Sequence, residues 1–98
     1  MVEVVFEVSC GKTVTDKIEL PDNIQGREKF KYGGKMVKML WDLYKKANCN
    51  GAKVKIIAKG KKKAEKTIEI ESDLDHRKRI GYGGKVVRIV WELYDLVK

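Results

Sequence analysis

The sequence predicts an α+β fold in which one ββα unit occurs twice, as ββα-ββα, forming a four-stranded antiparallel sheet with two helices packed on one face. Residues 1–48 align with residues 51–98 at a constant offset of 50, without a gap and with 13 identities. Each copy opens on two stretches of alternating apolar and polar residues, which are typical of half-buried strands. Each ends on a largely apolar stretch with helical spacing. The 98 residues therefore predict a single domain made of two units with pseudo-twofold symmetry.

Each unit is expected to begin with a hairpin. The first turns near Cys10-Gly11-Lys12 and the second near residues 60–63, where glycine permits the positive φ angles that tight turns often need. A polar loop of about a dozen residues follows each hairpin, and residues 48–51 link the two units. The order of elements is thus two strands and a helix, repeated.

The helices are predicted from around Gly34 to Ala47 and from around Gly84 to Val97. Their polar positions form one narrow stripe, so the apolar face is wider than a helix needs to lie on a sheet. Each helix should therefore pack on two sides, against the sheet and against the sister helix, with a homodimer contact as the alternative for the second side. The aromatic residues expected in this core are Trp41, Tyr44, Trp91 and Tyr94.

Symmetry also predicts the sheet. Two copies of one strand related by a twofold axis perpendicular to the sheet run antiparallel, so the first strands of the two units should pair at its centre in the order 2-1-3-4. A register that sets Glu3 opposite Lys59 and Glu7 opposite Lys55 places opposite charges together on one face. A slip of one residue would expose apolar side chains to water.

Catalytic and metal chemistry find little support in the sequence. Cys10 and Cys49 are too few and too unpatterned for a disulfide scaffold, and we expect free thiols. His76 is the sole histidine and has no counterpart in the first unit, which is typical of an exposed loop residue. One histidine and two isolated cysteines do not make a four-ligand zinc site. The sequence therefore predicts a protein that is not an enzyme, with no cofactor and no metal.

The most repeated motif is Tyr-Gly-Gly-Lys, at residues 32–35 and again at 82–85, placed at the predicted helix starts. One interpretation is an anion site, because free N–H groups at a helix N-terminus attract phosphate and glycine allows close approach. The other is structural, with the glycines needed by the backbone and Tyr32 and Tyr82 sealing the edge of the core. The motif is not a nucleotide-binding P-loop, because the spacing of the glycines and the residue after the lysine both differ.

Charge gives the main functional prediction. The chain has 22 Lys and Arg against 14 Asp and Glu, a formal charge of +8, of which residues 50–98 carry +6 and residues 1–49 carry +2. Dense cationic clusters of this kind neutralise a phosphate backbone. We therefore predict a small nucleic-acid-binding protein that contacts DNA or RNA largely without sequence preference. The residues predicted to contact phosphate are Lys61, Lys62, Lys63, Arg77, Lys78, Arg79 and Lys85, with a weaker contribution from Arg27, Lys29, Lys31 and Lys35.

Two alternatives stay open. A solvated lysine surface is ordinary in a Lys- and Glu-rich chain of thermophile-like composition. A protein-interaction or self-association module would instead use an apolar surface, either the outer side of the helix pair or Val5 and Ile57 on the open face of the sheet. No stretch is long and apolar enough to span a membrane and no signal peptide is evident, so a soluble, cytoplasmic protein is expected.

Overall fold

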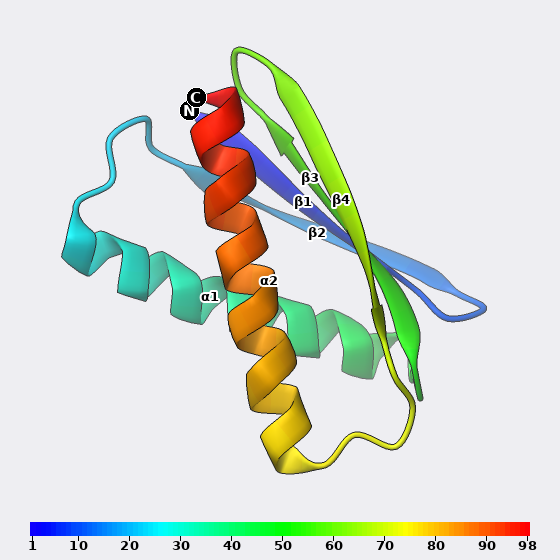
Figure 1. The fold of residues 1–98 in the computed structure, drawn as a ribbon. Coiled ribbons are helices and arrows are strands. Elements are labelled where there is room, and N and C mark those ends of the chain that lie inside the picture. The colour runs from blue at the N-terminus through cyan, green and yellow to red at the C-terminus, as the bar shows by residue number, and fades with distance from the viewer.

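The computed structural model, which describes residues 1–98, contains one four-stranded antiparallel sheet and two helices (Figure 1). Both helices lie on the same face of the sheet and cross one another there. The strand order β2-β1-β3-β4 and the α+β class confirm the predictions from sequence. In chain order the elements are β1 (Val2–Ser9), β2 (Thr13–Leu20), α1 (Gly26–Lys46), β3 (Ala52–Lys59), β4 (Lys63–Ile70) and α2 (His76–Val97).

The register at the centre of the sheet is the predicted one. Glu3 lies opposite Lys59 and Glu7 lies opposite Lys55, with Val5 opposite Ile57 between them. The ion pairs, however, form with the outer strands: Glu3 pairs with Lys17 of β2 and Lys55 pairs with Glu65 of β4, each at 3.7 Å. Exposed pairs of this kind contribute little to stability, so the alternation of buried side chains fixes the register.

The core lies between the sheet and the helices. The even-numbered residues of β1 point into it and are fully buried, while the odd-numbered ones are only partly covered on the open face. No buried side chain is polar or charged. The largest fully buried side chains are Phe6, Leu20, Met36, Leu40 and Ile56.

Both helices begin eight residues earlier than predicted, so the expected dozen-residue loops are only five residues long. Asp75 caps α2 by accepting a hydrogen bond from the Lys78 N–H at 2.8 Å, and Gln25 N–H donates to Glu28 Oε1 at 3.5 Å at the start of α1. The two Gly-Gly pairs therefore lie inside helices. Glycine is a poor helix former, which is why the sequence placed the helix starts there, but tertiary packing overrides that preference. Neither helix has a stretch long and apolar enough to cross a membrane.

Gly33 and Gly83 are placed where the helices cross. A Cβ on Gly33 would lie 3.5 Å from the Val87 side chain, and one on Gly83 would lie 3.3 Å from the Val37 side chain. The glycines thus bring the two helices together. The prediction that Tyr-Gly-Gly-Lys begins each helix is wrong, and the motif offers no free helix N-terminus to an anion.

The two hairpin turns lie at the predicted positions but differ from each other in backbone conformation. Gly11 has a φ of +91°, as expected of a turn glycine, whereas Gly60 does not have a positive φ.

The prediction of free thiols is wrong: Cys10, in the first turn, forms a disulfide with Cys49, just beyond the end of α1. The two cysteines are 39 residues apart in sequence, and only the folding of α1 against the sheet brings them together.

Candidate nucleic-acid interface

The positive charge of the molecule is concentrated on α1 and α2, which we call the helix layer. The two helices carry twelve Lys and Arg against four Asp and Glu, giving a formal charge of +8. The remaining residues carry ten of each sign, so the sheet, the turns and the termini are neutral in sum. All sixteen charged side chains of the helices are exposed. The charges of the two halves of the sequence, +2 and +6, do not show this segregation, because each half contains both strands and a helix.

The structure places eight of the eleven predicted phosphate contacts on the helix layer. The other three, Lys61, Lys62 and Lys63, lie at the turn between β3 and β4, and all eleven are exposed. The residues predicted to contact phosphate on α1 are Arg27, Lys29, Lys31 and Lys35, and those on α2 are Arg77, Lys78, Arg79 and Lys85.

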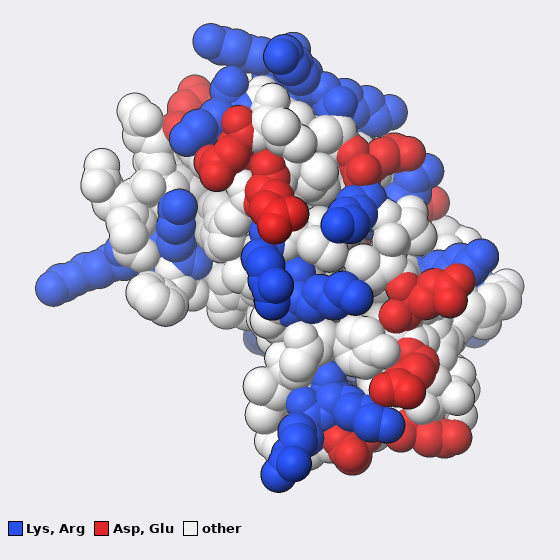
Figure 2. Space-filling model, viewed as in Figure 1, with Lys and Arg blue, Asp and Glu red and all other residues white.

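The two densest clusters do not converge. The Lys61 N–H donates to the Val97 carbonyl oxygen at 2.7 Å, so the lysine-rich turn lies against the last turn of α2. Arg77–Arg79 lie in the first turn of the same helix, whose 22 residues span about 33 Å. Figure 2 shows blue side chains at the top, where this turn lies, and others at the lower end, where α2 begins, with both red and blue side chains between them. A ligand that contacts both clusters must therefore be long.

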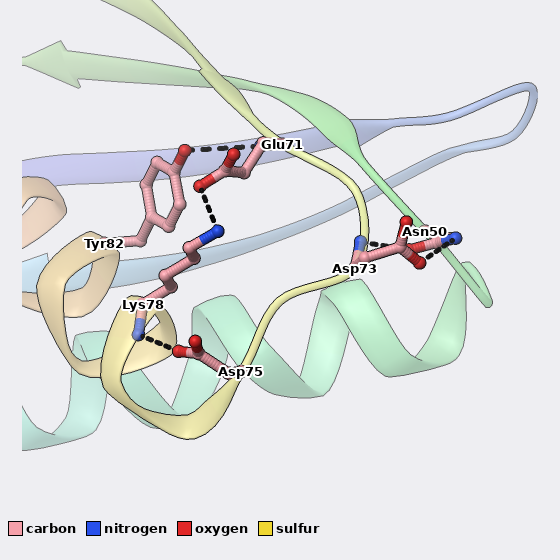
Figure 3. A network of polar contacts seen from close by, with 6 residues as sticks. All are labelled: Asn50, Glu71, Asp73, Asp75, Lys78 and Tyr82. Atoms are coloured by element: carbon pink, nitrogen blue, oxygen red, sulfur yellow. Dashed lines mark hydrogen bonds and ion pairs between the residues drawn. The ribbon is translucent and has the colours of Figure 1, made fainter.

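Acidic neighbours partly neutralise the cluster at the start of α2 (Figure 3). Lys78 forms an ion pair with Glu71 at 3.4 Å, and the Glu71 N–H donates to the Tyr82 hydroxyl at 3.3 Å. In the same loop, Asp73 is held by two hydrogen bonds with Asn50, at 2.7 and 3.3 Å. Residues 71–75 contain three carboxylates, so this end of α2 is less positive than Arg77–Arg79 alone indicate.

Lys35 and Lys85 lie close to the helix crossing. The Gly33–Val87 and Gly83–Val37 contacts bracket the crossing, and the two lysines come at the midpoint of these contacts along each helix. Both side chains are exposed, and Lys35 has its ammonium 5.5 Å from the centre of the Tyr32 ring. The two lysines therefore lie on the solvent side of each helix, level with the crossing, because residues two positions away from Gly33 and Gly83 are on the opposite side of the helix from the contact.

Two other predicted cations cover tryptophan rings across the crossing. The Arg79 guanidinium lies 5.3 Å from the centre of the Trp41 ring, and the Lys29 ammonium lies 5.6 Å from that of Trp91. Tyr44 and Tyr94 are buried as predicted, but both tryptophans are only half-buried, which corrects their placement in the core. Both tryptophans pack against the edge of the core and remain partly accessible to solvent.

Sequence reasoning missed a hollow in the surface beside the crossing, of about 600 Å³, which we call the Phe30 hollow. Phe30, Gly33 and Gly34 of α1 and Gly84, Val87 and Trp91 of α2 line it, together with Lys29. The Phe30 side chain is 86% exposed. On the other side of the crossing, Ile80 lies at the position 50 residues later, is 66% exposed, and lines a smaller hollow of about 360 Å³ with Val37, Trp41 and Arg79. The matching apolar residues at positions 30 and 80 were the signal in the sequence that could have indicated these hollows.

No three His, Cys, Asp or Glu side chains lie close enough together to hold a metal ion. The chain matches no family model, no curated protein and no solved structure.

Proposed function

We propose that this protein binds nucleic acid through the helix layer, contacting phosphates largely without sequence preference and without catalysing a reaction. The observation that carries the proposal is the segregation of charge, with +8 on two helices that cover one face of a neutral remainder. A one-sided positive layer attracts a polyanion and releases its counterions. A lysine surface serving solubility alone has no need of such segregation, since charges of both signs spread over the surface suffice.

Within this proposal the residues have different roles. Lys35 and Lys85, at the crossing, make the central contacts, and the remaining helix cations extend the surface along each helix. The Lys61–Lys63 turn makes a separate contact about 30 Å from the start of α2, a distance that about nine base pairs of duplex span. Lys78 contributes least, because Glu71 already neutralises it.

Salt dependence with matched charge reversals tests the proposal. Lys35→Glu with Lys85→Glu should weaken binding to duplex DNA and make the log-log salt slope shallower by about 1.8, since each lost phosphate contact contributes about 0.9. The control is Lys12→Glu with Lys53→Glu, which changes the net charge equally on two exposed lysines outside the helices, one in the first hairpin turn and one in β3. Equal losses from both pairs would show diffuse attraction without a binding face, and no binding to duplex or single-stranded DNA at low salt would overturn the proposal.

A second candidate is self-association through the apolar part of the helix layer, supported by the exposure of Phe30 and Ile80. Charge opposes it, because two such faces would bring +8 against +8. A dimer of this kind should therefore form more readily as salt screens the repulsion, whereas nucleic-acid binding weakens with salt. Light scattering after size-exclusion chromatography at low and high salt separates the two.

We further propose that the chain arose as a tandem duplication whose halves are related by a pseudo-twofold axis. The bounds of the strands support it, because β3 and β4 begin and end 50 residues after β1 and β2.

A cytoplasmic location in a heat-adapted organism is also our proposal: the composition is rich in Lys and Glu, and disulfides occur inside cells of hyperthermophiles.

A further inference from the structure

The lining of the Phe30 hollow has the chemistry of a site for an apolar group. Phe30 is almost wholly exposed on one side of it, and the half-buried Trp91 lies on the other helix. Its walls are otherwise glycine and valine, and the only charged group that lines it is the Lys29 ammonium. An aromatic ring that is 86% exposed has no packing role within the chain.

The glycines of the hollow provide a second observation. Gly33 is explained by the helix crossing, but a Cβ on Gly34 or Gly84 would meet no atom within 4 Å. Glycine is unfavourable inside a helix, so these two residues are not there for helix stability or for packing. Gly34 and Gly84 both line the Phe30 hollow, and the absence of a side chain at these two positions keeps the hollow open.

Charge decides the occupant. The hollow lies within the +8 helix layer, with Lys31 and Lys35 on the same helix as Phe30. A second copy of the chain would bring a second positive layer, whereas a single-stranded nucleic acid brings flat bases on a negative backbone. Stacking on aromatic side chains in a positive groove is how sequence-tolerant proteins bind such strands.

We propose that the Phe30 hollow binds an unpaired nucleobase, stacked on the Phe30 ring, while Lys29 and Lys35 contact the adjoining phosphates. This inference rests on the proposed function and names its ligand class, a single strand or an unpaired segment of DNA or RNA. The hollow at Ile80 is smaller and has no exposed ring, so it contributes phosphate contacts through Arg79 and little stacking. The two sides of the crossing therefore differ in role.

Two probes separate the base from the backbone: an oligothymidylate and an abasic oligomer of the same length. The protein should bind the oligothymidylate at least about fivefold more tightly, because stacking of one base on an aromatic side chain contributes that much or more. Phe30→Ala should remove the difference and leave affinity for the abasic oligomer unchanged, while Phe30→Tyr should preserve it. Ile80→Ala is the matched control and should change neither affinity.

A glycine pair gives an independent test. Gly34→Ala and Gly81→Ala both replace an exposed helix glycine whose Cβ would meet no atom, so both should raise the thermal midpoint. Gly81 does not line the hollow, so only Gly34→Ala should weaken oligothymidylate binding.

The outcomes distinguish the two proposals. Equal affinity of the unmodified protein for both probes overturns base stacking and leaves phosphate binding intact. Absence of binding to either probe and to duplex DNA at low salt overturns the proposed function itself. A dimer that Phe30→Ala disrupts, together with no preference for the oligothymidylate, would assign the hollow to a second copy of the chain and overturn the inference.

Discussion

The two halves of the chain hold a hairpin turn against a helix end by different means. In the first half Cys10 of the turn is joined to Cys49, beyond α1, by a disulfide. In the second half the position equivalent to Cys10 is Gly60, and the N–H groups of Lys61 and Lys62 donate to the Val97 carbonyl oxygen at 2.7 and 3.4 Å. A Cβ on Gly60 would overlap that oxygen. One half thus uses a covalent link where the other uses close backbone contact.

The disulfide should contribute more to the free energy of unfolding than the backbone contact of the second half does. Replacing Cys10 and Cys49 with Ser removes a cross-link between residues 39 apart, and the chain-entropy model gives a loss of about 4 kcal/mol in the free energy of unfolding. Urea denaturation with and without reductant measures it.

Reductant supplies the control for this prediction. It should lower the stability of the unmodified protein to that of the double Ser variant and leave the variant itself unchanged. Titration of two free thiols in the folded, unreduced protein would contradict the disulfide.

The backbone contact between the second hairpin turn and Val97 should make the next largest contribution to the free energy of unfolding. Gly60→Ala forces the turn away from Val97 and should cost about 1 to 3 kcal/mol, the usual range for inserting atoms into a packed contact. Amide hydrogen exchange should accelerate at Lys61 and Lys62, which lose their acceptor.

Gly11→Ala is the matched variant in the first turn. Its Cβ would meet no atom, but its φ of +91° is strained for alanine, so we expect a loss of about 1 kcal/mol without faster exchange at Lys61. Equal exchange rates in the two variants would mean that the contact with Val97 does not hold the turn.

The sheet could be predicted because its determinants are local in sequence. Alternation in β1 and β3 decides which side chains face the core, and this excludes a register shifted by one residue. Only the ion pairs differed, because Glu3 and Lys55 each have an oppositely charged residue on the outer strand as well as on the central one. Long flexible side chains choose between such partners without affecting the register.

The helix starts, the disulfide and the hollow could not be predicted from local pattern. The low helix propensity of glycine predicts a helix boundary at Gly33-Gly34. Gly33 instead lies inside α1, and the close approach of Val87 from α2 explains why glycine occupies that position. Cys10 and Cys49 meet only after α1 has packed. The concentration of charge on the helix layer was hidden because counting by halves mixes helices with strands.

The smallest expected effect compares the hydroxyls of Tyr44 and Tyr94. The Gly51 N–H donates to the Tyr44 hydroxyl at 2.8 Å, whereas the Tyr94 hydroxyl donates to the Pro21 carbonyl oxygen at 2.5 Å. Burial raises the pKa of Tyr94 above 10.0, with Asp22 and Asp95 adding to the shift. The folded state therefore favours the neutral hydroxyl. Its contribution is fully present below pH 10 and is lost as the pH rises through the pKa of the folded state.

Tyr94→Phe should cost about 1 kcal/mol at neutral pH, the usual net value of one hydrogen bond, and should make the alkaline fall in stability shallower. Tyr44→Phe should cost a similar amount at neutral pH, because it leaves the Gly51 N–H without its acceptor. Urea midpoints measured across the alkaline range for the three proteins check both statements. If Tyr94→Phe follows the same alkaline curve as the unmodified protein, deprotonation of other groups causes the fall, and the two tyrosines do not differ in the way their hydrogen bonds indicate.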